Sequence, residues 1–356
     1  MAAADGDADR RPLLVALRPL GVGDLLTGVP ALRGLAAAFP EHRRVLAAPA
    51  YLGRLAALSG AVDSVHHVEA LRPLPEALHG ADVAVDLHGR GPASHRILLA
   101  ASPERLLAFE RHDIPCSEGF PPWWPGEHEV RRWCRMLRGH GVPCDETDLH
   151  VRPPYEPAVA EWDGATLIHP GAAARARRWP PDRFGAVAAG ERSKGRTVVV
   201  TGSAGERGIA MEVAATAGLP AEAVLAGRLD LAQLASLVAQ VGRVVCGDTG
   251  VAHLATSCRT PSVVLFGPVP PSEWGPPPNP RHIALWKGVR GDPHGRAPDA
   301  GLLRIGVDEV FSALSDLDRF SPVPAGPVPA GPVPTGPVPT GQVPPRMCSE
   351  GSPAPR

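Results

Sequence analysis

The chain has 356 residues, which is enough for two α/β domains of ordinary size. Its formal net charge of −1 gives no electrostatic case for a nucleic-acid partner. The six cysteines form no Cys-x-x-Cys pair and no metal-ligand cluster, so we expect a reduced, cytoplasmic protein without a metal site. Residues 1–11 lack the apolar core of a signal peptide, and no apolar run of about 18 residues occurs. We therefore expect no membrane span, while peripheral membrane contact stays open.

Apolar strands alternate with helical stretches in the first half, which is typical of a parallel sheet with crossover helices. The expected strands are 13–17, 45–48, 62–68, 83–87 and 106–109, and the expected helices are 24–38, 51–58 and 128–139. A loop rich in Pro and Trp, 115–125, is a candidate lid or acceptor wall.

A proline-rich linker at 153–157 precedes a second half with the same alternation. Its expected strands are 166–169, 198–201, 223–226, 244–246, 262–266 and 282–285, and its expected helices are 182–194, 231–240 and 308–317. From 322 to 340 the chain repeats Pro-Val-Pro-Ala/Thr-Gly, so we expect residues 320–356 to be disordered. A role for this tail as a docking strip is a second possibility.

The most informative stretch lies at the second-half strand 244–246, in the sequence Cys-Gly-Asp-Thr-Gly-Val-Ala-His from Cys246 to His253. It predicts a strand, a tight turn and a helix start, which together present free N–H groups and a positive dipole end to an anion. Asp248, Thr249, Gly250 and His253 are therefore candidate phosphate contacts. The alternative is a simple helix cap with a structural histidine.

A second candidate phosphate site follows the strand 166–169. The loop after His169-Pro170-Gly171 carries Arg175, Arg177 and Arg178, and guanidinium groups bind phosphate oxygens bidentately. A solvated basic loop is the alternative. Glu206, which follows the strand 198–201, is a candidate ribose ligand or a first-turn glutamate favoured by the helix dipole.

Five segments, in this order, resemble glycosyltransferase family 9, the ADP-heptose:lipopolysaccharide heptosyltransferase family. They are Leu17 to Asp24, His169 to Pro180, Gly202 to Glu206, Asp248 to His253, and Leu265 to Pro276, and the resemblance covers roughly residues 12 to 318.

The resemblance implies an α/β fold of the GT-B type, with two Rossmann-like domains facing across a cleft. Residues 12–155 would form the acceptor-side domain and 156–305 the nucleotide-sugar domain. The helix at 306–319 would pack back on the first domain. The implied activity is inverting, metal-independent transfer from a nucleotide-diphospho sugar, best guessed as ADP-heptose, to a hydroxyl acceptor. No cofactor is implied, and we expect a monomer.

The resemblance also assigns roles to single residues. Asp24 would be the catalytic base, although the sequence alone is equally compatible with a helix N-cap there. Arg177, with Arg178, would contact the donor phosphates at a position where the family commonly has Lys. Glu206 would hold the ribose, and Asp248, Thr249, Gly250 and His253 the diphosphate and sugar. Gly23 and His88 lie on the acceptor side, and His88 replaces a frequent Gln.

Two other functions remain open from the sequence. One is a GT-B nucleotide-binding protein that has lost transfer activity. The other is a Rossmann oxidoreductase, for which Gly21-Val22-Gly23 supplies only part of the Gly-x-Gly-x-x-Gly pattern.

Overall fold

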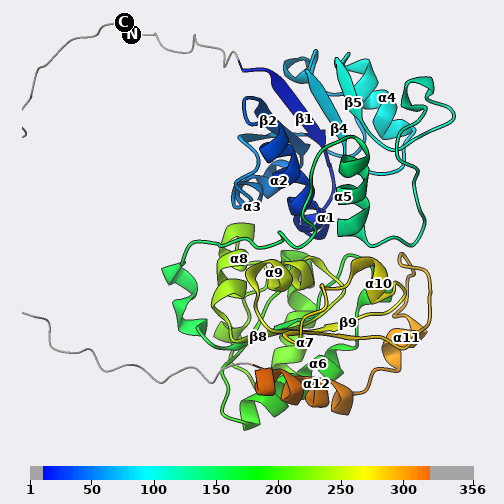
Figure 1. Ribbon diagram of the computed structural model, residues 1–356. Helices are drawn as coiled ribbons and strands as arrows, with labels where there is room; N and C mark the ends of the chain where they lie inside the picture. The colour runs from blue at the N-terminus through cyan, green and yellow to red at the C-terminus, as the bar shows by residue number, and fades with distance from the viewer. Residues whose placement is uncertain (1–10, 321–356) are drawn as a thin grey trace, which may run out of the picture. The chain divides into compact units, whose positions relative to one another are not determined.

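The computed structural model describes residues 11–320, which contain two parallel five-stranded sheets (Figure 1). We expect disorder over residues 1–11 and 320–356, and of these segments residues 1–10 and 321–356 lie outside the described part of the chain. The first sheet has the order β3-β2-β1-β4-β5. Its strands are β1 (Leu13–Leu17), β2 (Arg43–Ala48), β3 (Ser64–His67), β4 (Val83–Asp86) and β5 (Arg105–Leu107).

The second sheet has the order β10-β9-β8-β6-β7. Its strands are β6 (Thr166–His169), β7 (Val198–Val200), β8 (Arg243–Gly247), β9 (Ser262–Leu265) and β10 (His282–Leu285). The strand expected at 223–226 is wrong. That segment contributes a single parallel bridge between Val224 and Val200, because the 3-10 turn η7 (Ala221–Ala223) occupies its start.

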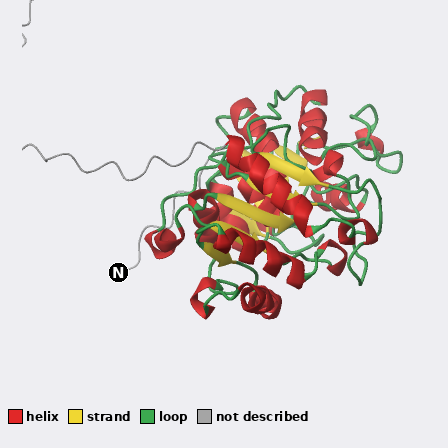
Figure 2. Ribbon diagram, turned by 90° about the horizontal axis from the view of Figure 1, so that it is seen from below, coloured by secondary structure: helices red, strands yellow, loops and turns green. Residues whose placement is uncertain are grey.

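Helices and short 3-10 turns connect the strands and surround them (Figure 2). In the first half they are η1 (Ala50–Leu52), α1 (Val22–Thr27), α2 (Val29–Ala38), α3 (Gly53–Ala57), η2 (Glu76–Leu78), α4 (Ala93–Ala100), η3 (Pro115–Ser117) and α5 (Glu129–Gly139). In the second half they are η4 (Pro157–Trp162), η5 (Arg175–Arg177), α6 (Pro181–Ser193), η6 (Ala204–Glu206), α7 (Arg207–Ala217), α8 (Leu231–Gln240), α9 (Gly250–Cys258), α10 (Pro271–Trp274), α11 (Ala300–Leu303) and α12 (Val307–Phe320).

The helix expected over 24–38 is two helices, α1 and α2, which meet at Gly28. Pro30, the second residue of α2, has no N–H to continue the hydrogen-bond ladder of α1. A Cβ at Gly28 would also lie 3.1 Å from Nε of Arg18, so the junction is shaped by the side chain packed beneath it.

The central strand β1 is buried on both faces. Leu14 and Ala16 belong to one apolar cluster, and Val15 and Leu17 belong to another. This alternation is the period of two that a strand imposes on its side chains. The first of these clusters continues into the second half through Val244 and Leu254, so both halves share one core.

The last helix, α12, packs against α6, β9 and β10 of the second half (Figure 1). Its apolar side chains Val310, Leu314 and Leu317 are buried in the second-half cluster. Asp318 near its end pairs with Arg196 at 2.8 Å and also with Arg243. The expectation that this helix packs on the first domain is therefore wrong, because its apolar face completes the core over the second sheet.

Across residues 11–320, no helix is long and apolar enough to cross a membrane.

Candidate active site

The site residues gather where the strand order of each sheet reverses. In the first sheet the connections diverge between β1 and β4, and in the second between β6 and β8. Open α/β sheets bind ligands outside the carboxyl ends of their strands at such points. Asp24 and His88 follow β1 and β4, and the candidate phosphate loops follow β6 and β8.

The starts of α1 and α9 touch each other. A Cβ at Gly250 would lie 2.9 Å from Cβ of Val22, and a Cβ at Gly23 would lie 2.7 Å from Cδ2 of His253. Both distances are shorter than a real Cβ contact, so only glycine fits at the two positions without a shift of the neighbours. Gly23 and His253, which the sequence assigns to the acceptor side and the donor side, are thus in direct contact.

Asp24 is the third residue of α1, and the capping position is held by Gly21. The N-cap interpretation is therefore wrong for this residue. Its Oδ2 accepts a hydrogen bond from the Gly21 N–H at 3.2 Å, and its Oδ1 lies 3.9 Å from Nη2 of Arg18. The side chain is 26% exposed, so a carboxylate lone pair faces solvent at the switch point. This geometry is compatible with a proton acceptor for a bound hydroxyl.

His88 lies beside this carboxylate on the loop after β4. Its N–H donates to Oδ1 of Asp86 at 2.9 Å. Burial lowers the pKa of His88, and the charge of Arg18 adds to the effect, whereas Asp86 and Asp24 oppose it. We therefore expect a neutral imidazole. Such a ring can donate a hydrogen bond to a hydroxyl of the acceptor substrate or accept one from it.

Two fully buried side chains support the His88 loop from beneath. Oδ2 of Asp86 lies 2.7 Å from Nδ1 of His95, and Nε2 of His95 lies 2.8 Å from the carbonyl of Phe109. Burial lowers the pKa of His95, but the ion pair with Asp86 and the hydrogen bond to the Phe109 carbonyl together outweigh it, and the net shift is upward. Since both ring nitrogens face acceptors, the residue is suited to the protonated form.

On the donor side, Arg177 reaches Asp248. Its Nη1 lies 3.4 Å from the Asp248 carbonyl and 3.7 Å from Oδ2. Burial raises the pKa of Asp248, and the guanidinium opposes that rise. Nε of Arg177 has no hydrogen-bond partner within residues 11–320. The Arg177 side chain is 26% exposed, so donors remain for a ligand anion.

Thr249 occupies the N-cap position of α9 with an extended backbone. In the described part of the chain its side chain makes no capping hydrogen bond, unlike the usual cap threonine. Of the first-turn N–H groups of α9, that of Ala252 donates to the Thr249 carbonyl at 3.0 Å, whereas Gly250 and Val251 come before the first residue that can bond within the helix. The turn therefore offers backbone N–H donors and a free hydroxyl to an anion.

His253 lies one turn into α9, with its ring 5.8 Å from the ring of Trp274 in an edge-to-face arrangement. Burial lowers its pKa to about 4, and the nearby His128 and Arg177 contribute to the shift. The ring is therefore neutral at pH 7 and acts as a hydrogen-bonding group rather than a cation.

Glu206 lies between the carboxyl ends of β6 and β7. Its Oε2 accepts from the N–H and the hydroxyl of Ser203, both at 2.8 Å. Burial raises the pKa of Glu206, but these hydrogen bonds outweigh it and the net shift is downward. A Cβ at Gly171 would overlap the Glu206 carboxylate, so the two loops are in contact. Glu206 thus accepts hydrogen bonds from Ser203 at the start of its own helical turn. Its contact with a ribose stays a prediction.

Arg178 and His169, at the two ends of the loop after β6, make contacts of their own. Nε of Arg178 donates to the Ala172 carbonyl at 2.8 Å, and its Nη2 lies 3.9 Å from Oε1 of Glu206. His169 is buried, and its Nδ1 pairs with Oγ1 of Thr201 at 3.0 Å. Burial lowers the pKa of His169 to about 4, so this neutral residue links β6 to the end of β7.

Sequence reasoning gave no role to Arg18, although it is buried directly beneath the Asp24 helix. The available signal was an arginine placed immediately after a fully apolar strand. Within residues 11–320, no group of three or more His, Cys, Asp or Glu side chains is arranged to hold a metal ion.

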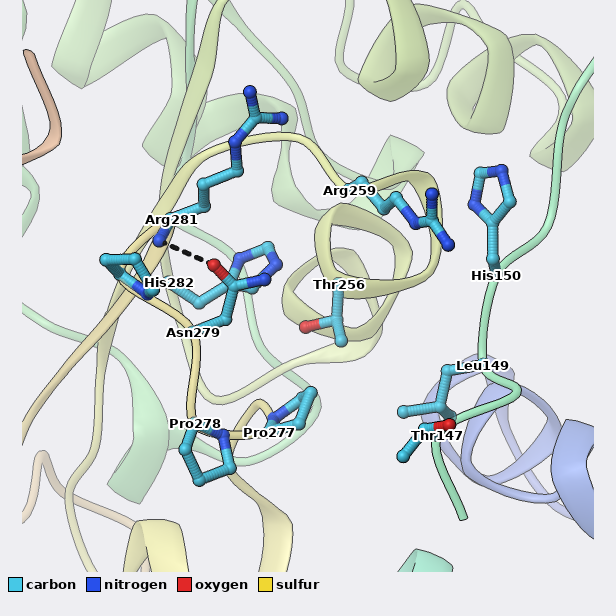
Figure 3. Close-up of a pocket in the computed structure, with 11 residues that line it drawn as sticks. Thr147, Leu149, His150, Thr256, Arg259, Pro277, Pro278, Asn279, Arg281 and His282 are labelled. Carbon is cyan, nitrogen blue, oxygen red and sulfur yellow. Dashed lines mark hydrogen bonds between the residues drawn. The ribbon is translucent and has the colours of Figure 1, made fainter. Parts of the chain in front are cut away.

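Two neighbouring cavities lie along α9. One, of about 450 Å³, borders the site through Thr27, His128 and His253. The other, of about 610 Å³, is lined by His150, Arg259 and His282 among others (Figure 3). Because His282 begins β10, this larger cavity lies at the amino edge of the second sheet, away from the phosphate loops. Cavity size alone would misplace the site.

Comparisons with known sequences show relatives in one family. The model of glycosyltransferase family 9 (heptosyltransferase) matches residues 124–298. Lipooligosaccharide heptosyltransferase 2 of Haemophilus influenzae is 32% identical over 107 residues, which cover 29% of this chain and 30% of that protein. Lipopolysaccharide heptosyltransferase 2 of Escherichia coli is 33% identical over 105 residues, with the same coverage of this chain and of the relative. The chain's match thus spans about 30% of the length of these curated relatives.

Solved structures extend the likeness over the whole fold. The ADP-heptose lipopolysaccharide heptosyltransferase II of E. coli superimposes with a TM-score of 0.69 at 20% identity, covering 86% of this chain and 99% of that one. A family 9 glycosyl transferase of Veillonella parvula gives 0.70 at 17% identity, covering 87% and 98%. The expected GT-B-like fold, with its two parallel sheets, is confirmed.

Proposed function

This chain belongs to glycosyltransferase family 9, and from that premise we propose that it is an inverting, metal-independent glycosyltransferase. It transfers a sugar from a nucleotide-diphospho sugar to a hydroxyl of a glycan or small molecule. The observation that supports the proposal is the contact between the starts of α1, which carries Asp24, and of α9, which carries the candidate phosphate contacts Thr249 and Gly250.

In the proposed reaction the diphosphate lies against Thr249, Gly250 and Arg177. The acceptor hydroxyl gives its proton to the Asp24 carboxylate while its oxygen bonds to the anomeric carbon. The bond from that carbon to the diphosphate oxygen breaks, and the nucleoside diphosphate leaves with the electron pair. Attack from the opposite face inverts the anomeric configuration.

The leaving diphosphate gains negative charge as this bond breaks. Arg177 and the first-turn N–H groups of α9 supply fixed positive partners for that charge. Asp248 holds Arg177 by an ion pair at 3.7 Å, so the guanidinium is oriented before the ligand arrives. The neutral His253 would contact the sugar or a phosphate oxygen.

ADP-heptose is the donor that the relatives favour. E. coli heptosyltransferases have been solved with ADP and with ADP-2-deoxy-2-fluoro heptose, at 16% identity to this chain. In our proposal the nucleoside ribose lies near Glu206, between the ends of β6 and β7. The acceptor lies on the first-half side, near Gly23 and His88.

The first test is a thermal-shift screen of the purified protein against ADP, UDP, GDP, TDP and CDP, with NAD as the control. A shift with one nucleoside diphosphate alone supports the proposal and names the donor's nucleotide. A shift with NAD alone would replace it by an oxidoreductase. Release of ADP from ADP-heptose is then measured with a panel of glycan and small-molecule hydroxyl acceptors, and binding without release with every acceptor would indicate a nucleotide-binding protein that has lost transfer.

A further inference from the structure

Arg18 is a buried cation at the carboxyl end of β1. Only 1% of its surface is exposed, although a guanidinium carries five N–H donors that all need acceptors when buried. Its Nε donates to the Asp24 carbonyl at 2.6 Å, and its Nη1 donates to the Leu87 carbonyl. Its Nη2 reaches Oγ1 of Thr27 at 3.3 Å and Oε1 of Glu129 at 3.2 Å.

These acceptors belong to three separate elements. Asp24 and Thr27 are in α1, Leu87 follows β4, and Glu129 begins α5. Leu87 immediately precedes His88, so the guanidinium is bonded to the backbone of both segments that carry the acceptor-side residues. Because the fork of a guanidinium is planar and rigid, its bonds fix the angle between these segments as well as their distance.

The charge of Arg18 is compensated by a small buried network. Glu129 also accepts from Nε1 of Trp133 at 2.7 Å and from Arg132. The Trp133 ring lies beneath the guanidinium, with its centroid 5.0 Å away. A well-packed apolar side chain often replaces a buried ion pair without loss of stability, so stability alone does not require an arginine here.

We propose that Arg18 is a positioning residue, which holds the Asp24 helix and the His88 loop at the separation that the acceptor hydroxyl needs. Arg18 acts through backbone carbonyls, and does not itself touch a substrate. This inference rests on the proposed transferase function for its catalytic consequence. Its structural part, the coupling of α1 to the β4 loop, can be tested whatever the reaction is.

The test compares Arg18→Met and Arg18→Lys with Arg33→Met. Arg33 is a matched control because its guanidinium, like that of Arg18, donates to backbone carbonyls, here those of Ser59, Asp148 and His150. Its side chain is 24% exposed, and its bonds join α2 to the connection between the halves rather than to the site. Hydrogen exchange of the amides and release of ADP from ADP-heptose are measured for all three variants.

Both methionine variants should lower Tm. Only the Arg18 variants should speed amide exchange in residues 21–28 and 87–90, and only they should lower kcat, by about 10²-fold for a displacement near 1 Å. The thermal shift produced by ADP should stay as in the wild type. Lysine should not restore kcat, since one ammonium cannot span the carbonyls of Asp24 and Leu87.

The proposal would be overturned if amide exchange in residues 21–28 and 87–90 of Arg18→Lys equalled that of the wild type. It would also be overturned if Arg33→Met lost as much kcat as Arg18→Met. If Arg18→Met does not fold, Glu129→Gln serves in its place, because it weakens the hold on Nη2 while leaving Arg18 present. A wild-type protein that never releases ADP would refute the proposed function instead. The exchange data would still decide whether Arg18 couples the two segments.

Discussion

Replacing Asp24 by Asn should remove transfer while leaving the donor site intact. The amide keeps the shape of the side chain, and its oxygen can still accept from the Gly21 N–H, now 3.2 Å away. The variant loses only the capacity to take a proton from the acceptor hydroxyl. Loss of a general base costs about 10²–10⁴-fold in kcat, which is about 2.7–5.4 kcal/mol on the barrier.

Folding should change little in the same variant. Oδ1 of Asp24 lies 3.9 Å from Arg18, whose Nη2 is closer to Glu129 at 3.2 Å, so the cation keeps a carboxylate partner. At 3.9 Å, and with the Asp24 side chain 26% exposed, this pair contributes at most about 1 kcal/mol. The thermal shift with ADP should equal that of the wild type, because Asp24 is not among the groups that face the diphosphate.

The assay follows ADP release from ADP-heptose under single-turnover conditions, with Asp82→Asn as the control. Asp82 is also a first-half carboxylate that accepts a backbone N–H, that of Leu13 at 2.6 Å, but it precedes β4 at the other edge of the sheet. Asp82→Asn should therefore keep the wild-type rate. Full activity of Asp24→Asn, or an equal loss in the two variants, would refute the assignment of Asp24 as the base.

Three further predictions concern the donor side, the contact between the helices and pH. Arg177→Ala should weaken the binding of ADP and slow the release of ADP from ADP-heptose, because the cation that stabilises the leaving diphosphate is lost. If calorimetry shows an unchanged affinity for ADP, a neighbouring arginine binds the diphosphate instead. Gly23→Ala should lower kcat, since its Cβ would lie 2.7 Å from Cδ2 of His253, whereas Gly53→Ala, where the nearest atom is 4.0 Å away, should be neutral in the same assay. Burial lowers the pKa of His169 and of His253 from 6.5 to about 4. Between pH 4 and pH 6.5 the unfolded chain therefore binds more protons than the folded one, so the free energy of unfolding should fall as the pH drops from 6.5 toward 4. Urea unfolding at pH 7 and pH 5 measures this fall, and His169→Asn should reduce it; a slope unchanged by that substitution would contradict the assignment.

Much of the fold follows from the sequence. The strands β1, β6 and β10 and the helix α8 have the bounds expected from their apolar runs. Short apolar strands and an amphipathic Ala- and Leu-rich helix are determined by the spacing of neighbours a few residues away, so local patterns suffice to find them. The parallel arrangement then places the phosphate loops and Asp24 at carboxyl edges.

The errors have two physical causes, a local break in the backbone and contact with residues that are distant in the sequence. The start of α2 is set by Pro30 but also by Arg18 packed under Gly28. The segment at Val224 pairs with β7 through a single bridge. The apolar face of α12 was visible in the sequence, but the sequence did not show which half it would cover; the face lies in the core of the second half, against α6, β9 and β10.

The sequence by itself determined the class of fold, the alternation of its elements and the side chains available to bind an anion. These features depend on local backbone preferences and on the spacing of apolar residues along the chain. Packing in three dimensions, by contrast, brings Gly23 to His253, lays α12 on the second sheet, and lets one guanidinium join α1, the loop after β4, and α5. Such contacts depend on which surfaces come together in three dimensions, and the residues involved are separated by as many as 230 positions between Gly23 and His253.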